Sequence, residues 1–160
     1  MGRVSHDHAL FERAVEANRE AEGRRARALL HVTELCGEGR RREVLPWLLP
    51  AMRRDQALGR IRLWRLDQAM YGTTRARALR WIRRMRETIG DKSNTKDGYA
   101  TLDWALHDQK ASVRMTTWLW LLMVREHEAE FMPPDGFPYR QVFDPDEGDE
   151  GKENHSGTSE

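Results

Sequence analysis

Two groups of arginines are the residues of this sequence best suited to binding a ligand. One group comprises Arg24, Arg25 and Arg27, and the other comprises Arg60 and Arg62. Arginine carries a permanent positive charge on a planar fork of N–H donors that matches the oxygens of phosphate and the edge of guanine. Arginines at this density therefore predict a polyanionic ligand.

A turn that leads into a helix is the third candidate, and it comprises Gly72, Thr73, Thr74, Arg75 and Arg77. Backbone N–H groups at the start of a helix have no partner within the helix, and the helix dipole adds positive charge there, so a phosphate is stabilised at this end. Gly72 has no side chain and lets a ligand approach the backbone closely. Either threonine can cap the helix, and the two arginines would add charge-assisted hydrogen bonds.

Charge is distributed unevenly along the chain, although the formal net charge is only +1. Residues 19–86 contain 18 arginines, no lysine and 7 acidic residues, which gives a local net charge of +11. Residues 126–160 contain 2 basic and 11 acidic residues, which gives −9. This asymmetry indicates a polyanionic partner for the basic part and a solvated or masking role for the acidic part.

Residues that support catalysis or metal binding do not converge in the sequence. His127 lies between Glu126 and Glu128, but a metal site needs several ligands at fixed geometry, so we expect these side chains to face solvent. Asp103 and Asp108 have the spacing of a carboxylate pair, yet nothing places them in a pocket. The sequence has no phosphate-binding loop, nucleophile elbow or zinc-finger spacing. We therefore expect no enzyme activity, no cofactor and no metal.

Cysteine content and hydropathy predict a cytoplasmic protein. Cys36 is the single cysteine, so no disulfide can form within the chain, and a reducing compartment is expected. The N-terminal residues lack the apolar run of a signal peptide. The longest apolar run, residues 118–124, is far too short to cross a bilayer, so no membrane association is expected.

The elements that would position the arginines are predicted to be helices. Apolar residues at spacings of three and four predict a long helix over residues 8–36, a short helix over 63–70, and a third from the threonines to Ile89. In the third helix the apolar side chains share one face, and the opposite face carries Arg77, Arg80 and Arg84.

The rest of the chain is also predicted to be helical, with polar connections. We expect a short helix over residues 44–49 that Pro50 ends, another over 51–58, a loop over 90–98, a short helix over 100–108 and an apolar helix over 113–131. Most tryptophans lie in apolar helical settings and are expected in the core: Trp47, Trp81, Trp104, Trp118 and Trp120. Trp64 flanks the turn, and both a core position and base stacking remain open for it.

The segment from Leu58 to Ala78 reads L-G-R-I-R-L-W-R-L-D-Q-A-M-Y-G-T-T-R-A-R-A. It resembles the pattern L-G-K-x-K-V-x-x-L-L-x-x-L-P-G-V-G-x-x-x-A of the actinobacterial, mycobacterial-type integration host factor family. Residues 24–28, 37–39 and 44–45 are also similar to the family. Tyr71 and Thr74 stand where the pattern has proline and its second glycine.

The resemblance covers about residues 10–106 and implies a helix–two-turn–helix module behind a long N-terminal helix. Family members bind double-stranded DNA with little sequence preference, bend it, and organise the nucleoid or assist phage integration. A nucleoid location, a phage integrase as partner and a phage-encoded variant are thereby implied. The residues that would bind DNA are Arg60, Arg62, Gly72, Thr73, Thr74, Arg75 and Arg77, with Arg24, Arg25 and Arg27 as a second contact.

We therefore expect an all-α chain in three parts. Residues 8–108 would form the DNA-binding domain, residues 113–139 an added helical extension, and residues 144–160 a disordered acidic tail. Two other functions remain open, namely an RNA-binding module and a protein–protein adaptor that acts through the C-terminal helix and the tail. The sequence predicts no particular oligomeric state.

Overall fold

A computed structural model describes the backbone of residues 3–107 and 109–128, and the side chains of 8–107 and 113–128. Over this part of the chain the fold is all-α, as expected. The helices in chain order are α1 (Arg3–Gly37), η1 (Arg41–Glu43), α2 (Val44–Arg54), η2 (Gln56–Arg60), α3 (Leu63–Tyr71), α4 (Arg75–Ile89), η3 (Asp97–Tyr99), α5 (Leu102–Leu106) and α6 (Gln109–Arg125). None of these helices is long and apolar enough to span a membrane.

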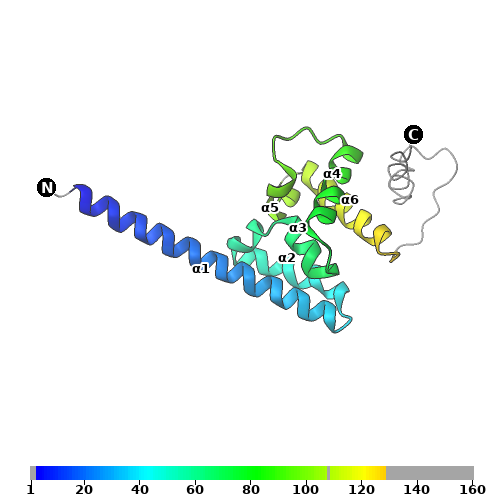
Figure 1. The fold of residues 1–160 in the computed structure, drawn as a ribbon, viewed down its shortest axis with the longest axis horizontal. Helices are drawn as coiled ribbons and strands as arrows, with labels where there is room; N and C mark the ends of the chain where they lie inside the picture. The colour runs from blue at the N-terminus through cyan, green and yellow to red at the C-terminus, as the bar shows by residue number, and fades with distance from the viewer. Residues whose placement is uncertain (1–2, 108, 129–160) are drawn as a thin grey trace, which may run out of the picture.

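α1 reaches well beyond the rest of the molecule at its N-terminal end (Figure 1). Its 35 residues correspond to a length of about 52 Å. Residues 8–20 are all exposed, whereas Ala28, Val32 and Leu35 near the other end are buried in the core. Only the C-terminal half of α1 is therefore held by packing.

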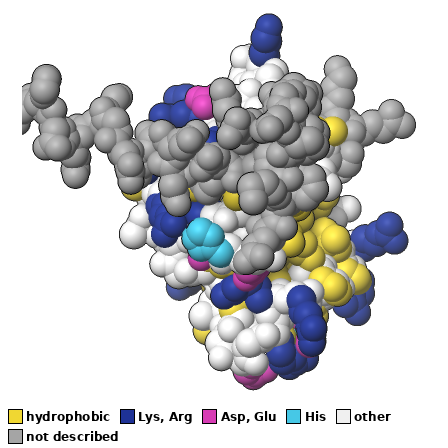
Figure 2. All heavy atoms as spheres, turned by 90° about the vertical axis from the view of Figure 1, so that its right-hand side faces the viewer, with side chains coloured by type: hydrophobic (Ala, Val, Ile, Leu, Met, Phe, Trp, Pro, Cys, Tyr) yellow, Lys and Arg dark blue, Asp and Glu magenta, His cyan; other side chains and the backbone are white. Residues whose placement is uncertain are grey.

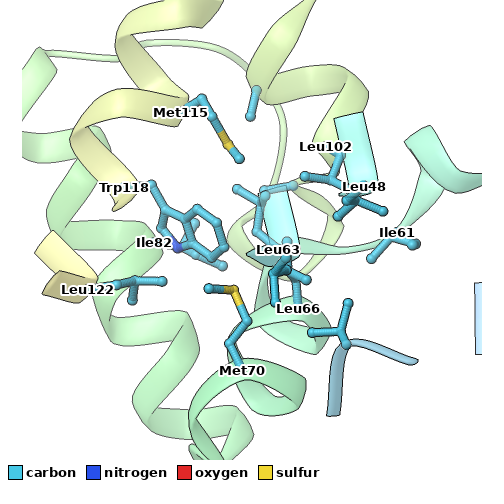
Figure 3. Close-up of a cluster of buried hydrophobic side chains, with 14 of the residues drawn as sticks. Leu48, Ile61, Leu63, Leu66, Met70, Ile82, Leu102, Met115, Trp118 and Leu122 are labelled. Atoms are coloured by element: carbon cyan, nitrogen blue, oxygen red, sulfur yellow. The ribbon is translucent and has the colours of Figure 1, made fainter. Parts of the chain in front are cut away.

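The core lies where the C-terminal half of α1 meets the shorter helices. Figure 3 shows apolar side chains from α2, from the residue that follows η2, and from α3 to α6 pointing toward one another; those labelled are Leu48, Ile61, Leu63, Leu66, Met70, Ile82, Leu102, Met115, Trp118 and Leu122. α6 thus shares this core with α3 and α4. Residues 129–139 of the expected extension and the acidic tail at 144–160 lie outside the described residues.

A buried ion pair joins α3 to α6. The guanidinium of Arg125 donates two hydrogen bonds to the carboxylate of Asp67, at 2.8 and 2.9 Å, and both side chains are almost fully buried. The same guanidinium lies 5.2 Å from the ring centroid of Tyr71. Burial is the largest single effect and lowers the pKa of Arg125, but the hydrogen bonds and charges of Asp67 and Glu126 together outweigh it, so the net shift is upward and the arginine stays charged.

The sequence predicted the helices around the turn closely. The expected helices over residues 8–36, 63–70 and 74–89 correspond to α1, α3 and α4. Thr74, not Thr73, caps α4, because its hydroxyl accepts a hydrogen bond from the N–H of Arg77 at 3.3 Å. On the inner face of α4, Ile82 and Met85 are fully buried.

The helix boundary expected at Pro50 is wrong. Pro50 lies inside α2, which continues to Arg54. Proline removes one helical N–H donor and normally ends a helix, but Pro50 is exposed, while Leu48 and Ala51 on either side are buried. The burial of these neighbours holds the helix together across the proline, and residues 51–58 are divided between α2 and η2.

The boundaries expected for the last helix are also wrong. α6 runs from Gln109 to Arg125, not from 113 to 131. The helix ends where His127 adopts a positive φ of 54°, a conformation that cannot continue a right-handed helix.

Candidate nucleic-acid interface

A groove of about 950 Å³ lies between α1, η2, the start of α3, η3 and α5. In Figure 1, α3 and α5 lie together above α1. Four arginines line the groove, namely Arg25, Arg60, Arg62 and Arg65, together with two acidic residues, Glu22 and Asp103. The groove therefore brings one residue of the first predicted arginine group together with both residues of the second.

The backbone on either side of the groove explains how these residues meet. The N–H of Leu63 donates to the carbonyl of Ala100 at 2.9 Å, and the N–H of Leu102 donates to the carbonyl of Ile61 at 3.0 Å. These bonds form a short antiparallel bridge between Arg62 and Thr101. As a result, residues 60–62 and 99–102 are held as one wall of the groove.

Gly59 allows the close approach of η2 to α5. A Cβ atom at this position would lie 2.0 Å from Oδ1 of Asp103, so any larger residue would displace that carboxylate. The displaced carboxylate would move within the groove, because Asp103 is one of its lining residues.

One class of arginines is bound to carboxylates of the chain itself. Arg86 donates to Asp91 and Asp97 at 3.1 and 2.9 Å and to the carbonyl of Ser93 at 2.6 Å, while Arg114 donates to Asp91 at 3.0 Å. Burial raises the pKa of Asp91, but hydrogen bonds from Ser93 and Arg114 outweigh it and lower the pKa overall. These arginines fix the loop between α4 and η3.

Arg24, one of the residues expected to bind DNA, also belongs to this class. Its Nε lies 2.9 Å from Oδ2 of Asp55, although the N–H is not aligned well enough for a hydrogen bond. The two side chains form an ion pair between α1 and the residue that precedes η2. Part of the positive charge of the first predicted group is therefore neutralised within the fold.

A second class of arginines has no carboxylate partner in the described part of the chain. It includes four of the predicted DNA-binding residues, which are Arg25, Arg27, Arg60 and Arg77. Arg25 is half-buried and the other three are exposed. Their N–H donors are available to an external anion.

A third class is stacked on aromatic rings. The guanidinium carbon of Arg62 lies 4.8 Å from the ring centroid of Tyr99, and those of Arg65 and Arg75 lie 5.4 and 4.9 Å from the centroid of Trp64. A stacked guanidinium is oriented by the ring face while its N–H donors point outward at the edge. The sequence did not predict Arg65 or Tyr99 as site residues. The position of Trp64 beside the turn was the one feature of the sequence that indicated an aromatic residue at the site.

The turn between α3 and α4 has the conformation that its glycine suggests. Gly72 ends α3 with φ 66° and ψ 16°, in the left-handed region. A Cβ at this position would meet no atom within 4 Å, so the surface is open. Thr73 is buried, which leaves Gly72, Thr74, Arg75 and Arg77 as the exposed members of the predicted turn site.

Substitution of Gly72 tests this turn as an anion site. Asparagine and aspartate have the same size and both tolerate the left-handed region better than other non-glycine residues. We expect Gly72→Asn to bind duplex DNA nearly as well as the wild type, and Gly72→Asp to bind about 5- to 20-fold more weakly, because its charge repels a phosphate. Fluorescence anisotropy with a labelled duplex measures the difference, and circular dichroism checks that both variants keep their helical content. Equal affinities of the two variants would show that no phosphate approaches Gly72.

One face of the molecule away from the groove shows a mixed distribution of side chains. Figure 2 views the end at which α6 finishes, and the lysine and arginine side chains visible there lie among hydrophobic, acidic and other side chains. On the described part of this face, therefore, positive side chains are interspersed with other types.

The positions considered for metal binding or catalysis remain separate. Among the described residues, no three His, Cys, Asp or Glu side chains converge in a way that could hold a metal ion. Asp103 is exposed at the groove, and Asp108 lies outside the described residues. Burial raises the pKa of the Cys36 thiol, which disfavours the nucleophilic thiolate.

The site and the fold were compared with known proteins at three levels. The chain matches no protein-family model, no curated protein and no solved structure. The resemblance of Leu58–Ala78 to the integration host factor family therefore stays a prediction from the sequence pattern.

Proposed function

We propose that this chain is a non-enzymatic protein that binds and bends double-stranded DNA with little sequence preference. The observation that supports this most directly is the basic groove. Its four arginines, Arg25, Arg60, Arg62 and Arg65, have no carboxylate partner in the described part of the chain. Groups of arginines whose donors are free favour the regular phosphates of nucleic acid, and such contacts carry little sequence information.

Bending requires the protein to hold two stretches of the DNA backbone at once. α3 connects two such contacts, because the groove arginines lie around its first residues and Gly72 and Arg75 lie at its far end. Its nine residues span about 14 Å. The buried pair of Asp67 with Arg125 anchors α3 to α6, so both contacts are fixed on a rigid helix.

The finer assignments follow from the sequence resemblance. We propose α3, its short connection and α4 as a helix–two-turn–helix module, and a role in nucleoid organisation or phage integration in the cytoplasm, with a phage integrase as partner. The free arginines of the groove would serve an RNA duplex as well as a DNA duplex, since both present phosphates. A direct comparison of the two duplexes separates these functions.

Binding to random duplex DNA is expected to be controlled by salt. If about five phosphates are neutralised, the slope of log K against log salt concentration is about −4 to −5. Anisotropy titrations of a labelled duplex at several salt concentrations measure the slope. A flat response would contradict an electrostatic interface, and tighter binding of duplex RNA of the same sequence at every salt concentration would favour the RNA-binding function. Partners retained after nuclease treatment in a pull-down would favour the adaptor function.

A further inference from the structure

Three arginines near the groove stack on two aromatic rings. We call Arg62, Arg65 and Arg75 the stacked row. Arg62 stacks on the ring of Tyr99, and Arg65 and Arg75 both stack on the ring of Trp64. The row begins in the groove, which Arg62 and Arg65 line, and continues to Arg75, the first residue of α4. It therefore connects the groove to the turn.

Both rings are attached to the same short helix, η3. Tyr99 belongs to η3, and the indole Nε1–H of Trp64 donates to the carbonyl of Gly98 at 3.3 Å. η3 is itself anchored to α4, because Asp97 accepts hydrogen bonds from Arg83 and Arg86 at 3.2 and 2.9 Å. The rings thus have fixed positions relative to the helices that supply the arginines.

The burial of the two rings suits a supporting role at a surface. Trp64 is half-buried, and Tyr99 has 62% of its surface exposed. Trp64 packs against the core and still leaves part of its surface exposed, whereas Tyr99 lies outside the core cluster, so both rings are accessible to the arginines that lie against them. An unstacked arginine has many rotamers and loses that freedom when it binds, whereas a stacked arginine is already oriented, so less of the binding free energy is lost in ordering it.

The spacing within the row allows contact with more than one phosphate of a strand. The guanidinium carbons of Arg65 and Arg75 each lie within 5.4 Å of one ring centroid, so they are separated by at most twice that distance. A DNA strand carries one phosphate per about 3.4 Å of helix axis, so a strand that runs past both arginines presents more than one phosphate over this length.

We propose that Trp64 and Tyr99 are positioning residues that hold the stacked row ready for phosphates of the DNA backbone that passes between the groove and the turn. This inference rests on the proposed function. It adds two aromatic residues to the interface and gives Arg62, Arg65 and Arg75 a fixed orientation between the groove contact and the turn contact.

A double-mutant cycle tests whether Trp64 acts through Arg75. Trp64→Leu is expected to weaken duplex binding by about 3- to 10-fold, because the cation–π contacts that orient two arginines are lost. Arg75→Gln should weaken binding markedly in the wild type and much less in the Trp64→Leu background. Arg77→Gln is the matched control: it removes the same charge two residues away, where no ring is stacked, and should have the same effect in both backgrounds.

Two further measurements separate positioning from folding. Trp64→Phe keeps a ring face without the indole N–H and should recover most of the affinity, with thermal melting monitored for every variant. If Trp64→Leu unfolds, the same cycle can be made at the exposed Tyr99. Tyr99→Leu then removes the ring and Arg62→Gln removes the stacked arginine, and Arg60→Gln is the control.

The possible outcomes are distinct. If the wild type binds duplex DNA but the ring substitution and the arginine substitution weaken binding additively, the positioning role is overturned and the proposed function is not. A wild-type chain that does not bind duplex DNA at any salt concentration would overturn the proposed function as well. Non-additive effects restricted to the stacked arginines support the proposal.

Discussion

Replacing Arg125 with methionine is expected to lower the free energy of unfolding by about 3–5 kcal/mol, because it leaves the buried carboxylate of Asp67 without its partner. Both hydrogen bonds between α3 and α6 are lost in this variant. Urea denaturation followed by circular dichroism measures the change as a lower midpoint at constant slope.

Two controls identify the cause of that loss. The double variant Asp67→Leu with Arg125→Met removes both charges and leaves an apolar contact of similar volume, so most of the stability should return. Arg40→Met removes an arginine that also contacts two carboxylates, those of Glu38 and Glu43. These side chains are exposed, and little change in stability is expected. A single Arg125→Met variant as stable as the wild type would show that α6 is not held by this pair.

The combined reversal Arg60→Glu and Arg62→Glu is expected to weaken binding of duplex DNA by about 30- to 150-fold at fixed moderate salt. Each arginine would lose a charge-assisted contact on the order of 1–1.5 kcal/mol at an exposed site. The slope of log K against log salt concentration should also become shallower by about 2, since two phosphates are no longer neutralised. Anisotropy titrations at several salt concentrations give both quantities.

The reversal Arg40→Glu and Arg42→Glu is the matched control. It changes the net charge by the same amount at the same sequence spacing, but at exposed residues outside the groove lining. It should leave most of the affinity intact. If both pairs of reversals weaken binding equally, the net charge of the chain governs binding, and the groove has no special role.

The helices around the turn could be predicted because their signals are local. The apolar spacing of α4, the cap at Thr74 and the glycine at position 72 each depend on residues a few positions apart. The arginines at 25, 60 and 62 were also identified by their local density. Their convergence on one groove was not, since it depends on how α1 packs against η2.

The pairing of individual arginines could not be predicted from the sequence. Asp67 and Arg125 are 58 residues apart, and nothing in the sequence around Asp67 indicates which basic residue it contacts. The sequence pattern does not distinguish Arg24 from its neighbour Arg25, yet Arg24 pairs with Asp55 and Arg25 lines the groove. The stacked row was missed for the same reason, because Trp64 meets Arg75 only once α3 and α4 are folded against each other.

α1 combines two levels of stability in one helix. Opening its hydrogen bonds between residues 8 and 20 exposes no buried side chain, whereas opening them around Val32 and Leu35 requires the core to separate. Local opening of a helix with no packed face needs far less free energy than global unfolding. The N-terminal half of α1 can therefore fray and re-form many times within the lifetime of one folded molecule, and its length can change in evolution without any compensating change in the core.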